Sequence, residues 1–168
     1  MRVSEITNKE IADYLRLEYA DLTIGEKTEL DTLLKVAKAY IKSYTGLEDV
    51  NAKGEEIGIG DGVETTYYVE HTNVVPDSET IYIDGIAKTK TTDYTFDYIT
   101  GKTIFLTPPT GTITADYKAV LVDKYEDFVI VVYVLVQDMY DNRSLYIDKN
   151  NMNKVVETIL GMHSINLL

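Results

Sequence analysis

The residues that could do chemistry begin with two histidines, His71 and His163, which lie far apart in the 168-residue chain. A histidine that binds a metal or acts as a base needs partners placed beside it. The chain has no cysteine, so thiolate metal ligands and disulfides are excluded. No metal-ligand spacing and no nucleophile–base arrangement can be built from short-range motifs. The sequence therefore predicts no catalytic residue, no metal ligand and no cofactor, and we expect that the protein is not an enzyme.

Two short motifs resemble ligand loops only in part. Residues 58–62 read Gly-Ile-Gly-Asp-Gly, but they lack the third glycine of a dinucleotide loop and the lysine of a P-loop. We interpret them as a flexible entry into a β region. Residues 148–152 begin like a calcium loop, but Met152 stands at a ligand position and the required glycine is missing. A helix N-cap is the better interpretation.

A lysine face is the remaining chemical feature. Lys35, Lys38 and Lys42 lie opposite the apolar stripe of a predicted helix. They could bind an anion, but charged helix faces are usually solvated, and Asp31 and Lys35 have the i,i+4 spacing of an ion pair. We favour a solvated face.

The charge of the chain limits its partners. The net charge is −12, divided as −3 over residues 1–50, −6 over residues 51–122 and −3 over residues 123–168. Such a chain should repel free nucleic acid. The negative surface could serve solubility alone, or it could let DNA pass without sticking. The N-terminus has no apolar run typical of a signal peptide.

Two helices are predicted at the N-terminal end. Thr7 and Glu10 have capping-box spacing and begin a helix over about 7–18. Thr23 and Glu26 form a second capping box and begin a helix over about 24–45, which ends before Gly46. The second helix carries one apolar stripe at helical spacing, made of Leu30, Leu33, Leu34, Ala37, Ile41 and Tyr44.

From residue 50 to residue 122 the helical period disappears and apolar residues alternate with polar ones. Asp84-Gly85, residues 100–102 and residues 108–111 are turn signals. Short strands at regular spacing suggest an antiparallel sandwich or barrel. The predicted strands are 66–69, 80–83, 94–96, 103–106 and 113–117.

Residues 125–146 contain the most apolar stretch, nine apolar residues from Phe128 to Val136. This is too short to span a membrane, which takes about 20 residues. The β-branched residues permit a buried strand, and the spacing of Phe128, Val131, Val132, Leu135 and Met139 permits a helix, so periodicity leaves both open. Met152, Val155, Val156 and Ile159 predict a last helix that ends near Gly161.

The predicted fold is therefore α+β. A small antiparallel bundle of about four helices, from residues 1–49 and 122–168, is interrupted by an inserted all-β sandwich or barrel at residues 50–121.

With the β insert removed, the helical pieces show two motifs in order. The long helix closes on Ala37-x-x-Tyr40-Ile41-x-x-Tyr44-Thr45-Gly46, and the apolar segment closes on Tyr140-Asp141-Asn142-Arg143. This pair resembles the head–tail connector (adaptor) family of long-tailed phages and prophages. The resemblance covers roughly residues 5–47 and 123–165. Family members commonly join these helices by a much shorter segment, whereas residues 60–117 here resemble small β modules of phage structural proteins.

The resemblance implies a structural virion protein at the phage neck, made in the host cytoplasm. Its subunits would form a ring, typically of about twelve copies. The ring would join the portal protein to a tail-side stopper or terminator protein, and double-stranded DNA would pass through its lumen without specific binding. No membrane would be involved. The resemblance also favours a helix over 125–143, and the insert is expected to project from the ring.

The resemblance assigns roles to particular residues. Asn142 and Arg143 are expected to tie the helix end to a neighbouring turn or subunit, with a local cap or salt bridge as the alternative. The apolar tail Ile165, Asn166, Leu167 and Leu168 is the candidate for docking onto the portal. Eight residues are expected to pack the helices together within one subunit and support the ring: Leu33, Leu34, Ala37, Ile41, Phe128, Val132, Leu135 and Met139.

A different class of function is a monomeric binding module. The chain has fourteen tyrosines and no tryptophan, and several tyrosines fall in the predicted strands. Aromatic rings on a sheet face can stack on a carbohydrate or bind another surface, but tyrosine is also an ordinary strand residue.

Overall fold

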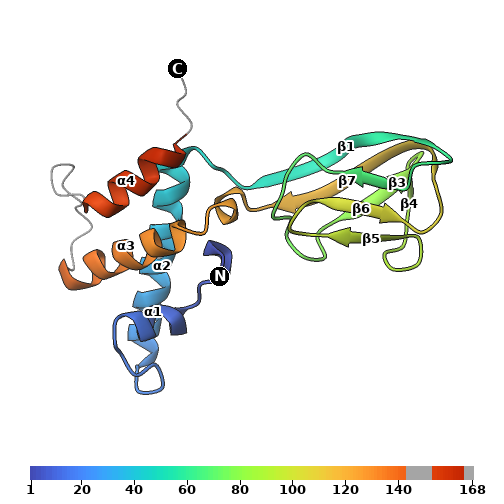
Figure 1. Cartoon of the computed structure of the whole chain (residues 1–168). Helices are drawn as coiled ribbons and strands as arrows, with labels where there is room; N and C mark the ends of the chain where they lie inside the picture. Colours follow the sequence, from blue (N-terminus) through green and yellow to red (C-terminus); the bar gives the residue numbers. More distant parts are fainter. Residues whose placement is uncertain (143–152, 165–168) are drawn as a thin grey trace. The chain divides into compact units, whose positions relative to one another are not determined.

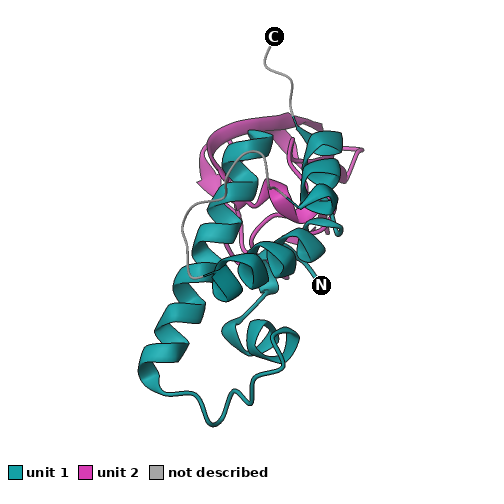
Figure 2. Cartoon of the chain, turned by 90° about the vertical axis from the view of Figure 1, so that its left-hand side faces the viewer, with its two compact units in different colours: residues 1–48, 125–168 teal, residues 49–124 magenta. Residues whose placement is uncertain are grey.

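The computed structural model of the chain describes residues 1–142 and 153–164. The chain forms two compact units, one from residues 1–48 and 125–168 and the other from residues 49–124 (Figure 2). The first unit is helical and the second is built of β-strands (Figure 1). The expected α+β fold, with a β region inserted between helices, is confirmed.

The helical unit contains a short 3₁₀ turn, η1 (Val3–Glu5), and the helices α1 (Asn8–Tyr14), α2 (Ile24–Thr45), α3 (Phe128–Asn142) and α4 (Lys154–His163). α2 has the predicted bounds. Its N-cap Thr23 accepts a hydrogen bond from the backbone N–H of Glu26, and the Glu26 carboxylate accepts one from the backbone N–H of Thr23. At the other end Gly46 takes a left-handed conformation with φ 74°, which stops the helix without Cβ strain.

α1 is shorter than the predicted helix over 7–18. It ends at Tyr14, and Arg16 takes a positive φ of 60°. The amide of Leu17 then bonds to the carbonyl of Ala12, which closes the turn after the helix. A left-handed residue cannot continue an α-helix, so the apolar spacing at Ile11, Tyr14 and Leu15 overstated its length.

The strand–helix ambiguity in the apolar segment is settled in favour of a helix, α3. Its buried residues are Phe128, Val131, Val132, Leu135, Val136 and Met139, which is the helical face that the spacing allowed. α3 packs against α2, and α4 packs against both. α4 begins at the N-cap Asn153, whose side chain accepts from the amide of Val155, and it continues through Gly161 to His163, so the expected end near Gly161 is two residues early. The N-cap expected within 148–151 lies outside the described residues.

The β unit has two antiparallel sheets. One has the strand order β1-β7-β3-β4 and the other β2-β6-β5. Asp84 and Gly85, with φ of 48° and 78°, form the predicted hairpin turn between β3 and β4. The strands are β1 (Val50–Asp61), β2 (Thr66–Tyr68), β3 (Thr80–Ile83), β4 (Ile86–Ala87), β5 (Tyr94–Asp97), β6 (Lys102–Phe105) and β7 (Thr110–Ala119).

β1 was not predicted, and the interpretation of residues 58–62 as a flexible entry is wrong. Gly58, Ile59, Gly60 and Asp61 belong to this twelve-residue strand, which pairs with β7. The register shifts twice, between Ala52 and Glu55 and between Glu56 and Gly58. Each shift breaks the apolar–polar alternation by which a strand is recognised.

The two sheets share one core. It contains Tyr67 from β2, Phe105 from β6 and Tyr94 from β5, together with Ile81, Ile113, Ala115 and Tyr117 from the larger sheet. The rings of Tyr67 and Phe105 meet edge to face, with centroids 5.8 Å apart. Tyr67, Tyr94 and Tyr117 therefore serve as core residues, and buried tyrosine hydroxyls usually find a polar partner.

Candidate functional sites: the α2–α3 helix pair and a Glu–Glu–His cluster

The first motif lies on the last three turns of α2. Ala37, Ile41 and Thr45 are buried, whereas Tyr44 is 39% exposed. The Thr45 hydroxyl donates to the carbonyl of Ile41 at 2.7 Å, and the amide of Gly46 donates to the carbonyl of Lys42 at 2.8 Å. The run thus combines a buried face, a satisfied helix end and two neighbouring tyrosine rings, Tyr40 and Tyr44.

Most of the residues expected to pack the helices are buried. Leu34, Ala37 and Ile41 on α2 are at most 5% exposed. Phe128, Val132, Leu135 and Met139 on α3 are at most 6% exposed, and Leu33 is half-buried. Since α2 and α3 pack together, these residues are placed where the expected role needs them. Which of them meet across the pair, and any role in a ring, remain predictions.

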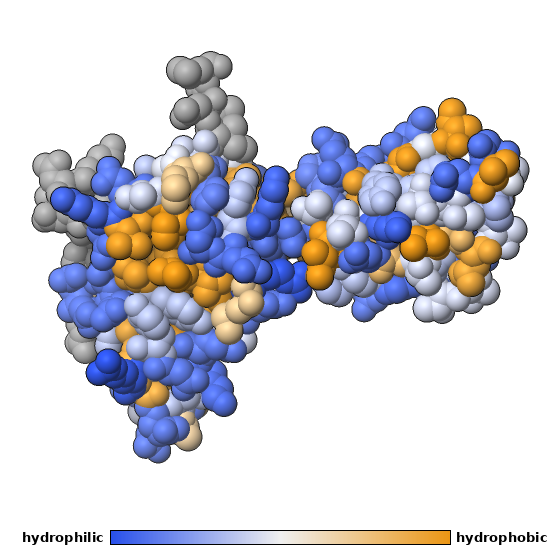
Figure 3. Space-filling view, viewed as in Figure 1, coloured by the Kyte–Doolittle hydropathy of each residue, from blue (hydrophilic) through white to orange (hydrophobic). Residues whose placement is uncertain are grey.

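The outer stripe of α3 is apolar in its middle. It consists of Ile130, 53% exposed, and the half-buried Val129, Tyr133 and Val134. Figure 3 shows an apolar patch over α3 on this face of the helical unit. Tyr133 is partly covered because its ring stacks on Tyr14 of α1, with centroids 4.7 Å apart and the planes inclined by 13°. α3 is therefore apolar on its outer side as well as on its buried side.

The end of α3 is described only in part. The Asn142 side-chain amide donates to the carbonyl of Asp138 at 2.8 Å within the same helix, and the expected tie to a neighbouring turn or subunit stays a prediction. Arg143 lies outside the described residues, as do Ile165, Asn166, Leu167 and Leu168 of the expected portal-docking tail.

The lysine face of α2 is tied to neighbouring groups. Lys35 pairs with Asp31 at 2.5 Å, as the spacing predicted, and the Lys38 ammonium donates to the carbonyl of Ile6 at 3.1 Å. Both lysines and Asp31 line a cavity of about 450 Å³ beside the start of α1. The predicted Asp31–Lys35 pair is present and Lys35 is solvated, with 74% of its side chain exposed, whereas Lys38 is half-buried.

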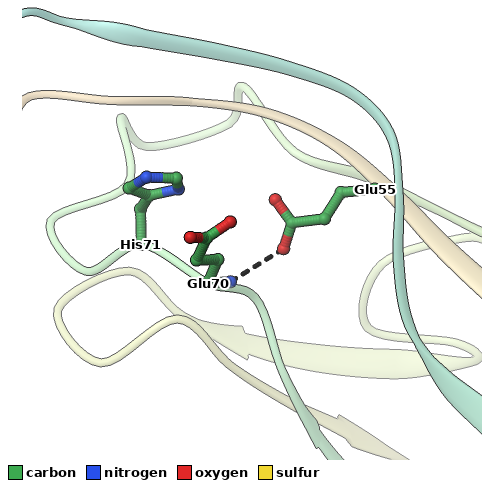
Figure 4. Close-up of side chains that lie close together, drawn as sticks. All are labelled: Glu55, Glu70 and His71. Atoms are coloured by element: carbon green, nitrogen blue, oxygen red, sulfur yellow. Dashed lines mark hydrogen bonds between the residues drawn. The ribbon is translucent and has the colours of Figure 1, made fainter.

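A cluster that the sequence motifs did not reveal lies in the β unit. Glu55 comes from β1, and Glu70 and His71 come from the segment that follows β2 (Figure 4). One possible ligand atom of each residue lies within 4.8 Å of the others. Glu55 and His71 are half-buried and Glu70 is exposed.

The first register shift of β1 sets the direction of Glu55. Val50 and Ala52 contact the core, and by strict alternation residue 55 would point away from it. The shift between Ala52 and Glu55, with Gly54 at φ 61°, reverses the alternation. Asp116 on β7 holds the bulge, because its carboxylate accepts from the Gly54 amide at 2.7 Å and from the Lys53 ammonium at 2.9 Å. The backbone bond from Gly54, and then the bond from Lys53, lower the pKa of Asp116.

Hydrogen bonds join the cluster to a buried tyrosine. Tyr117, 1% exposed, donates from its hydroxyl to Glu55 Oε2 at 2.6 Å, and the same hydroxyl lies 2.7 Å from His71 Nδ1. The backbone amide of Glu70 donates to Glu55 Oε1 at 2.7 Å. Burial, and then the neighbouring Glu55 carboxylate, raise the pKa of Tyr117, so its hydroxyl keeps its proton.

The segment that carries Glu70 and His71 is fixed to the second sheet. The amides of Val69, Asn73 and Val74 donate to the carbonyls of Gly101, Ile99 and Tyr98. A Cβ at Gly101 would lie 2.6 Å from the Val69 side chain and 2.7 Å from the His71 carbonyl. The close approach needs glycine, and it places both side chains on a supported backbone.

A second polar cluster in the β unit is paired internally. The Lys90 ammonium lies 2.7 Å from Asp77 and 3.5 Å from the almost fully buried Glu79, and the Tyr98 hydroxyl donates to Glu79 at 3.0 Å. The hydrogen bond to Asp77 is the largest cause of the raised pKa of Lys90. Lys90 and Tyr98 thus offset the charge of Glu79 through its Oε1, as a buried charge requires, whereas the buried Glu79 Oε2 has no hydrogen-bond partner among the described residues.

The tyrosines of the β unit do not form an aromatic platform. Tyr67, Tyr94 and Tyr117 are at most 8% exposed, Tyr82 and Tyr98 are half-buried, and Tyr68 is 56% exposed. A sugar-stacking surface needs several exposed rings on one face, so the structure gives no support for the carbohydrate-binding alternative.

The comparisons with known proteins give little beyond this geometry. No protein-family model matches the chain, and no curated protein matches it. A similar chain among solved structures comes from "Neck of empty GTA particle computed with C6 symmetry"; it is 14% identical, the match covers 99% of this chain and 93% of that one, and the TM-score is 0.44. A likeness at this level carries no conclusion about function. None of the helices in the described ranges is long and apolar enough to cross a bilayer.

Proposed function

We propose that this protein is a structural subunit of a phage neck. Its copies form a ring, about twelve by the resemblance of its motifs, which joins the portal protein to a tail-side stopper or terminator protein. Double-stranded DNA passes through the lumen. The role is one of assembly, with no catalysis.

The observation that carries the proposal is on α3. This helix ends with Tyr140, Asp141 and Asn142 of the second motif, and it packs on the helix that carries the first. It still exposes apolar residues on its outer side, Ile130 above all. A helix that is apolar on most sides is usually buried on most sides. A neighbouring copy in a ring would cover the outer stripe of α3, and such head-to-tail contacts close into rings when the rotation allows it.

The charge of the chain supports the same role. With a net charge of −12, a ring of many copies repels the phosphate backbone instead of binding it. DNA would then move through the lumen without being held. The negative net charge is therefore compatible with a channel through which DNA passes, and it argues against a protein that binds DNA.

The test is electron microscopy of the full-length protein mixed with its candidate portal protein. A second ring stacked on the portal is the expected result. The double variant Ile130→Asp, Val134→Asp should abolish the ring, because it places charges in the proposed contact. Ile24→Asp is the matched control, since Ile24 is 87% exposed at the start of α2 and lies outside that contact.

Portal particles without added density would overturn the proposal. So would a ring that the double variant forms as well as the unaltered protein does, because the outer stripe of α3 would then have no part in assembly.

A further inference from the structure

We infer that Glu55, Glu70 and His71 form a binding site for a divalent transition-metal ion of the Zn²⁺ type, which fastens the segment after β2 to β1. The inference is independent of the proposed neck function. It rests on the donor set, on the tautomer of His71 and on the rigidity of the two backbones that supply the ligands.

The donor set selects the class of ion. Two carboxylates and one imidazole lie within reach of a single centre. Ca²⁺ and Mg²⁺ prefer sites made entirely of oxygen, whereas imidazole suits Zn²⁺ and its neighbours. Water would complete a tetrahedral set around three protein ligands. In the part of the chain that the structure describes, no lysine or arginine forms an ion pair with Glu55 or Glu70, so their negative charge is available to a cation.

The hydrogen bonds fix which nitrogen of His71 is free. A tyrosine hydroxyl has one proton, and Tyr117 gives it to Glu55 Oε2 at 2.6 Å. The contact of 2.7 Å between that hydroxyl and His71 Nδ1 must then use a proton on Nδ1. In neutral His71 this leaves Nε2 with its lone pair, ready to bind a metal. A metal-binding histidine almost always donates its other N–H in this way.

Glu55 remains able to bind despite its two hydrogen bonds. Oε1 accepts from the Glu70 amide and Oε2 accepts from Tyr117, one bond each. Each carboxylate oxygen has two lone pairs, so each keeps one for an ion. These bonds orient the carboxylate beforehand, and Figure 4 shows it beside the Glu70 carboxylate and the His71 imidazole.

Both backbones are held in place without the metal. Asp116 anchors the bulge of β1, and the carbonyls of residues 98–101 anchor the segment with Glu70 and His71. The possible ligand atoms lie within 4.8 Å of one another, and ligands around a bound ion lie closer together than this. We expect the exposed Glu70 side chain to move and close the distance.

The test measures Zn²⁺ binding by tag-free, full-length protein, first stripped with chelator, using equilibrium dialysis and metal analysis. One Zn²⁺ per chain is expected. Glu70→Gln and His71→Asn should each weaken binding by about 100-fold or more, because even the loss of an outer-shell partner costs 10- to 100-fold. His71→Asn keeps a donor near Nδ1 for Tyr117 and removes Nε2. Glu56→Gln is the matched control, an exposed neighbour on β1.

A second readout separates a specific site from general attraction by an acidic protein. The chain has two histidines. Nε2 of the other one, His163, lies 2.8 Å from the Asp127 carboxylate oxygen Oδ2 and is hydrogen-bonded to it. Zn²⁺ should shift the ring nitrogen resonances of His71 and leave those of His163 unchanged. Absence of binding, equal binding by the His71→Asn variant, or equal affinity for Ca²⁺ would each overturn the inference.

Discussion

Gly60 on β1 shows how closely two backbones approach at the end of the larger sheet. A Cβ at this position would lie 2.4 Å from the carbonyl oxygen of Pro109 and 2.7 Å from its carbonyl carbon. Backbone atoms cannot move aside as a flexible side chain can, so Gly60→Ala must separate β1 from the start of β7. We expect the substitution to destabilise the β unit by about 1–3 kcal/mol, measured by urea unfolding.

Gly54→Ala is the matched control for that prediction. Gly54 has a φ of 61°, but a Cβ there meets no atom within 4 Å. The cost of Gly54→Ala is therefore only that of a Cβ in the left-handed region, about 1–2 kcal/mol. Equal stability of the Gly60→Ala variant and the unaltered protein would show that the two backbones lie further apart than described.

Tyr94 gives the β unit a dependence on alkaline pH. Burial, and then the charge of Glu79, raise the pKa of Tyr94 to about 12. The folded state therefore holds the phenol proton more tightly than the unfolded chain does. The resulting stability is complete below the unfolded pKa of about 10 and is lost as the pH rises towards 12.

We therefore expect the free energy of unfolding of the β unit to fall between pH 10 and pH 12, and to fall less steeply in Tyr94→Phe. Urea unfolding across this pH range is the measurement. The exposed Tyr68→Phe is the control, and it should follow the unaltered protein. Identical slopes for Tyr94→Phe and the unaltered protein would contradict the assignment to Tyr94.

Single residues also mark the limit of prediction from the sequence. His71 was set aside because the second histidine lies far away in the chain and there is no cysteine. Its neighbours Glu55 and Tyr117 come from β1 and β7. Glu55 faces Tyr117 and His71 because of the bulge at Gly54. A contact that depends on a register shift is invisible to motif spacing. The sequence signal that could have indicated it is the Lys53-Gly54 pair, at which the alternation of β1 is first broken.

At the scale of elements, α2 was predicted to the residue because its ends carry their own chemistry. Thr23 and Glu26 satisfy the first amides, and Gly46 supplies the left-handed stop. The predicted ends of α1 and α4 were less accurate. Arg16 takes a positive φ, which is unusual for arginine, and Gly161 lies inside α4 and does not end it. The helical state of α3 could not be decided by periodicity, because its outer stripe is also apolar.

The cap of α2 can be tested directly. Thr23→Ala removes the hydroxyl that accepts from the Glu26 amide at 3.3 Å and donates to the Glu26 carboxylate at 2.7 Å. We expect a loss of about 1 kcal/mol in the stability of the helical unit. Far-UV circular dichroism during thermal unfolding follows the helices. Thr23→Ser should retain the stability, because serine keeps both hydrogen bonds.

The same cap should also respond to acid. The Thr23 hydroxyl, and then its backbone amide, lower the pKa of Glu26. A carboxyl group with a lowered folded pKa contributes stability above its unfolded pKa, and that stability is lost as the pH falls through the folded pKa. The difference between Thr23→Ala and the unaltered protein should therefore shrink in acid. A difference that does not change with pH would assign the loss to the hydroxyl alone.

At the scale of the whole molecule, the proposed division into a helical domain and an inserted β domain predicts that each domain folds without the other. The β core is built within residues 49–124. Its first and last strands are partners, with Val50 paired to Ala119. Paired residues in antiparallel strands lie about 5 Å apart, so the insert leaves the helical chain and returns to it at neighbouring points. A short flexible linker should therefore be able to replace the insert.

We expect a variant with residues 49–124 replaced by about ten glycine and serine residues, which span about 17 Å on average, to keep the helical circular dichroism of α1 to α4. The separate 49–124 fragment should fold and give tyrosine signals in the near-UV. Its thermal midpoint should match one of two transitions in the full chain, and Zn²⁺ should raise only that transition, because a ligand stabilises the unit that binds it. A linker variant that is unfolded while the fragment folds would show that the helical domain depends on the insert, and the division into independent domains would then be wrong.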